Sequence, residues 1–279
     1  MNSNDAVQDF YDGCGEREWN RLDRADDGII ERELHARAFA EFLPPVPCRV
    51  LDIGGGAGRW TVWLAGRGYR VTLADLSPGL VEIAQTKVAA LPEAVRANVE
   101  AVCVADARDL SRWDDDSFDV VFSLGAFYHL TKAADRERAA TEAKRVLRRN
   151  GRLFAAMMPR LFFLIAVALE ETRTGAFAQV ADTLLNEGVY YDTRPGRFSG
   201  AYLFPPQEIA PFFARFGFHT LRLMASEGML ATVQSQVAAL AVREPETYRE
   251  LLDIAYQNAA DPTILGLAAH LLYIAEKTN

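Results

Sequence analysis

The sequence predicts a doubly wound α/β fold, in which helices cover both faces of a mostly parallel seven-stranded sheet. Three observations predict it. From residue 49 onward, short apolar segments alternate with helical patterns, which is typical of a parallel sheet. A glycine-rich turn at residues 54–58 joins the first apolar segment to the first helical pattern. The chain has 279 residues, 50% of them hydrophobic and 24% charged, and this is enough to bury a large core.

The strands and helices are expected in strict alternation. Each strand is apolar through its centre, as a strand buried on both faces should be; the first five are predicted at 49–53, 70–74, 100–104, 118–123 and 152–157. Helices are predicted at 58–65, 78–90 and 133–147. Ser77 and Pro78 form a start signal for the second helix, and Asn150 with Gly151 supplies a left-handed stop after the third. Two more strands are predicted at 218–224 and 270–277, and the last is expected to close the sheet in the antiparallel direction.

Three stretches lie outside this alternation and are expected to surround a site. Residues 1–48 form a charged helical lead, which we interpret as a lid, and residues 49–279 form the main α/β domain. Within that domain, residues 159–205 are predicted to be a substrate cap and residues 229–266 a helical insertion. The apolar run 162–165 should begin an amphipathic helix that packs on the lid or on a second subunit, so a homodimer remains an alternative.

Charge and composition narrow the classes of partner. A net charge of −8 and a pI near 5.2 disfavour nucleic acid as a substrate. The three cysteines are widely spaced and have no metal-ligand spacing, so we expect free thiols, no metal and a cytoplasmic location. The sequence shows no signal peptide, and its longest apolar run is too short for a bilayer crossing, so no membrane contact is expected.

The spacing of the glycine loop excludes two nucleotide-binding motifs. Glycines stand at 54, 56 and 58, whereas the dinucleotide motif G-x-G-x-x-G would require a glycine where Arg59 stands. A phosphate-binding P-loop would end in Gly-Lys followed by Ser or Thr, and no such ending is present.

The segment 50–58, VLDIGGGAG, resembles motif I of the class I S-adenosylmethionine (SAM)-dependent methyltransferases. Further ordered elements, at 71–77, 104–107, 116–124 and 145–151, are similar to the next parts of that family's Rossmann-like fold. The resemblance implies SAM as cofactor, with Asp75 accepting from the ribose hydroxyls and Asp106 from the adenine amine. Tyr11, in a Phe-Tyr element of the lead, would reach the cofactor carboxylate or pack the lid on the core. The full set of cofactor positions that the resemblance implies is Tyr11, Asp52, Gly54, Gly56, Gly58, Asp75, Leu76, Asp106, Ala107 and Leu124.

Candidates for catalysis and acceptor binding lie beyond the fourth and sixth strands and in the cap. His129 is a candidate general base, although the same position suits a structural histidine. Glu227 could face the same crevice or be a solvated loop carboxylate. An aromatic and cationic set in the cap suits a planar or acidic organic molecule, with an ordinary lid core as the alternative; its members include Tyr190, Tyr191, Arg194 and Tyr202. Tyr128, beside His129, is a further candidate for acceptor binding.

The function that these features predict is methyl transfer from SAM to an oxygen, nitrogen or carbon atom of a small organic molecule, such as a specialised metabolite. Two alternatives remain at this point. The fold could use SAM without consuming it, in a cyclisation or rearrangement, or it could bind SAM as a non-catalytic sensor. The sequence does not identify the acceptor or the oligomeric state.

Overall fold

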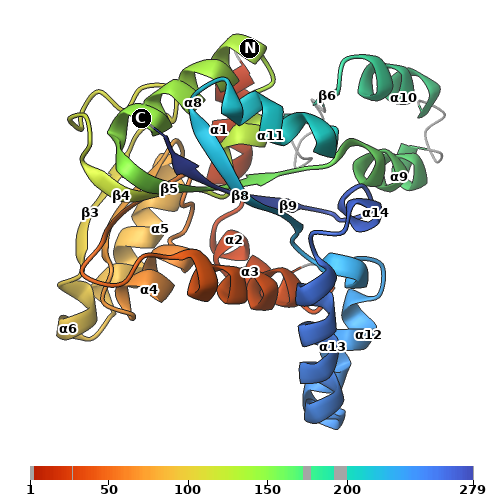
Figure 1. Cartoon of the computed structure of the whole chain (residues 1–279), viewed down its shortest axis with the longest axis horizontal. Helices are drawn as coiled ribbons and strands as arrows, with labels where there is room; N and C mark the ends of the chain where they lie inside the picture. Colours follow the sequence, from red (N-terminus) through yellow and green to blue (C-terminus); the bar gives the residue numbers. More distant parts are fainter. Residues whose placement is uncertain (1–2, 27, 172–176, 192–199, 279) are drawn as a thin grey trace.

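The computed structural model describes residues 3–26, 28–171, 177–191 and 200–278. A seven-stranded sheet in the order β3-β2-β1-β4-β5-β9-β8 forms its centre (Figure 1). The strands are β1 (Arg49–Ile53), β2 (Arg70–Asp75), β3 (Val99–Val104), β4 (Phe118–Ser123), β5 (Leu147–Met157), β8 (Phe218–Ala225) and β9 (Leu271–Lys277). Strands β1 to β5 pair in parallel, while β9 is antiparallel to both β5 and β8. The predicted fold class and the antiparallel last strand are confirmed, but β9 lies inside the sheet and β8 forms its edge.

Helices cover both faces of the sheet (Figure 1). One face carries α3 (Ile29–Phe42), α4 (Arg59–Ala65) and α5 (Pro78–Ala89), and the other carries α8 (Ala133–Val146) and α11 (Pro206–Ala214). A short helix, α6 (Glu93–Arg96), precedes β3. The predicted start of α5 is confirmed, because the Ser77 hydroxyl accepts a hydrogen bond from the Leu80 amide at 3.0 Å.

The end of α8 differs from the prediction. The helix ends at Val146 because Leu147 is extended and already pairs with Phe118 of β4. Asn150 does adopt the left-handed conformation that was expected, with φ of 62°, but this turn lies within β5 and does not end the helix. A tertiary strand pairing therefore replaces the local stop signal.

Two buried layers hold the sheet between its helices. The first fills the face below α8 and α11, with Phe118, Phe213 and Tyr273 among its largest side chains. The second fills the face below α3 and α4, where Phe39 packs against the rings of Phe122 and Phe154. Burial of this much apolar surface is the main stabilising contribution to the fold and makes the strand ends a firm base for a site.

The N-terminal segment crosses the carboxyl edge of the sheet. It contains α1 (Ser3–Asp12), α2 (Glu16–Asn20) and a 3-10 turn, η1 (Arg21–Asp23), before α3. The carboxylate of Asp12 accepts hydrogen bonds from the Ser77 hydroxyl and from the Gly79 amide, at the start of α5. These bonds fix α1 beside the end of β2.

The remaining elements fill the connections. Between β4 and α8 lies α7 (Ala126–His129); after β5 come α9 (Arg160–Glu171), α10 (Phe177–Asn186) and the hairpin of β6 (Val189–Tyr191) and β7 (Gly200–Tyr202). Between β8 and β9 lie η2 (Gly228–Leu230), α12 (Gln234–Arg243), α13 (Pro245–Asn258) and α14 (Pro262–Leu265). Figure 1 shows α12 and α13 side by side, projecting away from the sheet. Within the described ranges, no helix has both the length and the apolar character that crossing a bilayer requires.

Candidate cofactor and acceptor site

The glycine turn after β1 adopts a backbone that favours glycine at the predicted positions. Gly54, Gly56 and Gly58 have φ angles of 72°, 55° and 89°, in the left-handed region. A Cβ at Gly54 would stand 3.2 Å from the Ala126 backbone nitrogen, and one at Gly58 would stand 3.3 Å from Ala84. The turn therefore brings the backbone close to α7 on one side and to α5 on the other.

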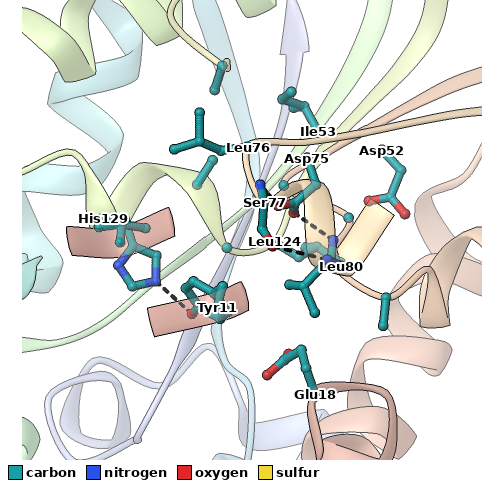
Figure 2. A pocket seen from close by; sticks show the side chains of 18 of the residues that line it. Tyr11, Glu18, Asp52, Ile53, Asp75, Leu76, Ser77, Leu80, Leu124 and His129 are labelled. Atoms are coloured by element: carbon teal, nitrogen blue, oxygen red, sulfur yellow. Dashed lines mark hydrogen bonds between the residues drawn. The ribbon is translucent and has the colours of Figure 1, made fainter. Parts of the chain in front are cut away.

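A cavity opens at this turn, between the strand ends and the N-terminal segment (Figure 2). Its empty space, including the open mouth, is about 1130 Å³. Most of the predicted cofactor residues line it, namely Tyr11, Asp52, Gly54, Gly56, Asp75, Leu76, Asp106, Ala107 and Leu124. Gly58 is not in the wall, because it forms the N-cap of α4 and packs against α5.

The two carboxylates at the ends of β1 and β2 are oriented by hydrogen bonds. Asp75 accepts from the Ser77 amide at 2.8 Å and from the Gly56 amide at 2.7 Å. Asp52 accepts from the Thr61 hydroxyl at 2.7 Å. Burial raises the pKa of each carboxyl to about 6. Both groups remain ionised acceptors at neutral pH, with lone pairs left for a ligand's hydroxyl groups.

Asp106 follows β3 and lines the cavity, as predicted, but its carboxylate already has a cationic partner. Arg108 Nε lies 3.0 and 3.1 Å from its two oxygens, and Arg108 also bonds to Asp135. An adenine amine would have to share these oxygens with Arg108. The adenine contact of Asp106 therefore stays a prediction.

Tyr11 and His129 meet across the cavity (Figure 2). The Tyr11 hydroxyl lies 2.7 Å from His129 Nε2, and His129 Nδ1 lies 2.9 Å from the Gly200 carbonyl oxygen. A carbonyl oxygen can only accept, so Nδ1 carries the proton and Nε2 presents a lone pair to the Tyr11 hydroxyl. Burial lowers the pKa of His129 to about 4, which keeps the imidazole neutral at physiological pH.

Three charged residues of the cavity wall were not predicted as site residues, namely Glu18, Arg21 and Arg59. Arg21 Nε bonds to Glu18 at 3.3 Å, and its Nη1 bonds to Glu31 at 2.8 Å. The only sequence signal was an opposite-charge pair three residues apart, which is common on any exposed helix. Tyr128, predicted to bind the acceptor, also lines the cavity, on the side of His129.

Glu227 does not face the cavity, contrary to the expectation for a catalytic carboxylate. It is fully buried beyond the cavity wall, and its Oε2 accepts from the amides of Ala269 and His270 at 3.1 Å each. The alternative of a solvated loop carboxylate is not met either. The antiparallel return of β9 encloses this residue, and the sequence pattern could not reveal that enclosure.

The predicted aromatic set of the cap does not gather at the cavity among the described residues. Tyr190 packs against Phe163, and Tyr202 lies under the Arg136 guanidinium at 3.5 Å. Tyr191 is 54% exposed and hydrogen-bonds to Thr131 at 2.6 Å. These contacts correspond to the lid-core alternative. Arg194 lies outside the described residues.

The donor set fits a nucleoside-type ligand with hydroxyl groups and a cationic centre. A backbone turn without side chains, an oriented carboxylate at the end of β2 and the apolar wall of Leu76 and Leu124 lie in one cavity. Two cationic side chains also line the cavity, and each already pairs with a carboxylate, Arg21 with Glu31 and Arg59 with Asp23.

Comparison with known proteins identifies this ligand class. A family model described as "Methyltransferase domain" matches residues 51–155. Magnesium-protoporphyrin O-methyltransferase of Rhodobacter capsulatus is 31% identical over 170 residues, which cover 57% of this chain and 71% of that protein. The ubiquinone/menaquinone biosynthesis C-methyltransferase UbiE of Acidiphilium cryptum is 28% identical over 207 residues, covering 72% and 79%.

The fold comparison agrees with the sequence comparison. A SAM-dependent methyltransferase structure from Methanosarcina mazei superposes with a TM-score of 0.60 at 18% identity, covering 86% of this chain and 97% of that one. The predicted cofactor, SAM, and the predicted enzyme class are thereby confirmed. The chain belongs to the class I SAM-dependent methyltransferases.

Proposed function

We propose that this enzyme methylates an oxygen, or a carbon activated by a neighbouring hydroxyl group, on a conjugated and largely apolar small molecule. One observation carries the proposal. The neutral imidazole of His129 has its Nε2 directed into the cavity, 2.7 Å from the Tyr11 hydroxyl. An acceptor that must lose a proton needs such a group beside it, whereas an acceptor that is already an anion does not.

The relatives support the acceptor class. One acts on oxygen of a magnesium porphyrin, and another on carbon in quinone biosynthesis, according to their names. Both of these acceptors are conjugated ring systems. The acceptor side of the cavity in this chain is correspondingly apolar and aromatic, with Leu124, Tyr128 and Leu130 in its wall.

SAM supplies an electrophilic methyl group when it is bound. On the cofactor side, we propose that Asp75 holds the ribose hydroxyls and that the amides of the glycine turn approach the rest of the nucleoside closely. Asp106 and Ala107 would flank the adenine, and Leu76 and Leu124 would exclude water from the reacting side. Asp52, buried behind the turn and bonded to Thr61, orients the loop.

On the acceptor side, His129 would take the proton of the acceptor hydroxyl at Nε2. The Gly200 carbonyl fixes the ring by accepting from Nδ1, so Nε2 keeps its lone pair without a tautomer change, and the acceptor hydroxyl would displace the Tyr11 hydroxyl from it. The pKa of His129, about 4, makes the imidazole a weak base. It therefore suits sharing the proton in the transition state, beside Tyr11, more than holding the proton before reaction.

The test pairs acceptor discovery with a conservative variant. Isotopically labelled SAM is incubated with phenol, hydroquinone and porphyrin-carboxylate acceptors, and products are identified by mass spectrometry. His129→Asn keeps a donor for the Gly200 carbonyl but removes the Nε2 lone pair. With a hydroxyl acceptor we expect kcat to fall on the order of 10²-fold at neutral pH and to recover partly as pH rises and the acceptor ionises.

The matched control is His219→Asn, which changes an exposed histidine of β8. It should keep the wild-type kcat. The proposal fails if His129→Asn turns over like the wild type, or if only acceptors without a dissociable proton are methylated. An isomerised product without consumption of SAM would favour the cyclisation alternative over methyl transfer.

A further inference from the structure

A second polar cluster lies behind the cavity and plays no part in the proposed reaction. Glu31 of α3, Glu227 after β8 and His270 before β9 each place one potential ligand atom within 4.8 Å of the other two. His270 Nδ1 lies 3.1 Å from Glu227 Oε1 and 3.9 Å from Glu31 Oε2. Both carboxylates are buried, whereas His270 is only partly so.

A fourth side chain beside the cluster has an unpaired polar atom. His35 is fully buried, and its Nε2 lies 2.8 Å from the Ser226 hydroxyl. Its Nδ1 has no hydrogen-bond partner within the part of the chain that the structure describes, and it stands 4.0 Å from Glu31 Oε1. A buried ring nitrogen without a partner is costly, so this nitrogen indicates a further polar group beside Glu31, such as a water bound to a metal ion.

The cluster places two buried carboxylates beside one guanidinium. Arg21 bonds to Glu31 at 2.8 Å. Among the described residues, Glu227 is contacted by the amides of Ala269 and His270 and by the His270 ring. A cation between Glu227 and His270 would therefore meet a buried carboxylate that has no guanidinium partner in the described part of the chain.

We propose that Glu31, Glu227 and His270 bind one divalent transition-metal ion. Carboxylate and imidazole ligands without thiolates suit Zn²⁺, Mn²⁺ or Fe²⁺, whereas Ca²⁺ and Mg²⁺ prefer oxygen alone. The ion would replace the proton that His270 Nδ1 donates to Glu227.

Both proposed carboxylate ligands already have outer partners that orient them. Arg21 holds Glu31, and the amides of Ala269 and His270 hold Glu227. Such outer contacts fix the direction of ligand atoms in protein metal sites. The bound ion would join α3 to the ends of β8 and β9, directly behind Arg21 of the cavity wall. Its role would be structural, and it does not depend on which acceptor the enzyme methylates.

The experiment uses the full chain without a histidine tag, treated with a chelator and then dialysed. Zn²⁺ binding is measured by calorimetry, and Co²⁺ binding by visible absorption. We expect one ion per chain, a rise in Tm with Zn²⁺, and a Co²⁺ spectrum of nitrogen and oxygen ligands without thiolate bands. Glu227→Gln and His270→Gln should each weaken binding by about 100-fold or more, since loss of an outer partner alone costs about 10- to 100-fold.

His219→Gln is the matched control, because it removes an exposed histidine, and its affinity should equal that of the wild type. Absence of stoichiometric binding to the wild type would mean that a proton alone occupies the cluster, and would overturn the proposal. So would full affinity in His270→Gln, or thiolate bands in the Co²⁺ spectrum. The spectrum of the unmodified chain decides the ligand type even if a variant fails to fold, which circular dichroism would reveal.

Discussion

The two halves of the cavity are assembled in different ways. On the cofactor half, the functional groups follow successive strands, with the glycine turn after β1, Asp75 at the end of β2 and Asp106 after β3. On the lid half, Tyr11 meets His129 across 118 positions of sequence, and Glu31 meets residues at the far end of the chain. The first half depends on local chain geometry, whereas the second depends on the docking of the N-terminal helices.

The electrostatics of the halves differ as well. Burial raises the pKa of Asp52 and Asp75 to about 6, and it lowers the pKa of His35 and His129 to about 4. In both cases burial favours the neutral form. A carboxylate becomes neutral by gaining a proton, whereas an imidazolium becomes neutral by losing one. Lowering the pH should therefore raise the free energy of unfolding through the buried carboxylates and lower it through the buried imidazoles.

The largest effect is expected on the cofactor half. Asp75→Ala removes the carboxylate that we propose for the ribose hydroxyls and leaves the Gly56 amide without its acceptor. Loss of two charge-assisted bonds should weaken SAM binding on the order of 10³-fold, measured by calorimetry. Asp114→Asn, which changes an exposed aspartate, is the control. An unchanged affinity in Asp75→Ala would remove this residue from the cofactor site.

The second-largest effect is expected in the pH dependence of the free energy of unfolding. The pKa of His129 is about 4 when folded against an ordinary value of 6.5, so the unfolded chain binds more protons between these values and stability falls as pH falls. From pH 8 to pH 5 this histidine should cost about 2 kcal/mol of unfolding free energy. For Asp52, with a folded pKa of about 6 against 3.8, the folded chain binds more protons and stability rises by about 1 kcal/mol over the same interval.

Urea unfolding at both pH values measures these terms. His129→Asn should lose less stability on acidification than the wild type does, and Asp52→Asn should lose more. His219→Asn should follow the wild type. The same change in both site variants would contradict the opposed signs of the two halves.

Tyr11 acts either with His129 on the acceptor or on the cofactor, and a variant distinguishes these two roles. Tyr11→Phe removes the hydroxyl that donates to His129 while keeping the ring. If Tyr11 acts with His129, kcat should fall by about 10-fold while the Kd of SAM stays constant. If Tyr11 instead reaches the cofactor carboxylate, the loss should appear in the Kd of SAM. Steady-state kinetics combined with calorimetry distinguishes the two roles.

The smallest effect is expected at Asp12, whose hydrogen bonds join α1 to the start of α5. Asp12→Asn keeps an acceptor for the Gly79 amide but removes the charge that lies beside the start of α5. A charge at a helix N-terminus contributes about 0.3–1 kcal/mol, so SAM should dissociate about 2- to 5-fold faster from a less firmly docked lid. Stopped-flow measurement of the SAM dissociation rate tests this, with the wild-type enzyme as the reference. A slower dissociation of SAM would contradict the role of Asp12 in holding α1 against α5.

The sequence by itself determined the fold class and the glycine turn. Both depend on strand periodicity and on glycines that require left-handed backbone, which are local features. The cofactor followed from the resemblance of the ordered motifs at 50–58, 71–77 and 104–107 to those of the methyltransferase family. The positions of Asp52, Asp75 and Leu76 in the cavity wall follow from the same rule, because parallel strands end at one edge.

Only the tertiary structure decided the rest. It set β9 inside the sheet, which buried Glu227 and brought it to His270 and Glu31. It also placed Arg21 in the cavity wall and kept Tyr190, Tyr191 and Tyr202 out of it. Such contacts join residues far apart in the chain, and they depend on packing between whole elements, which no local pattern of residues encodes. The physical limit of the sequence prediction is therefore the docking of the lid and of the last two strands.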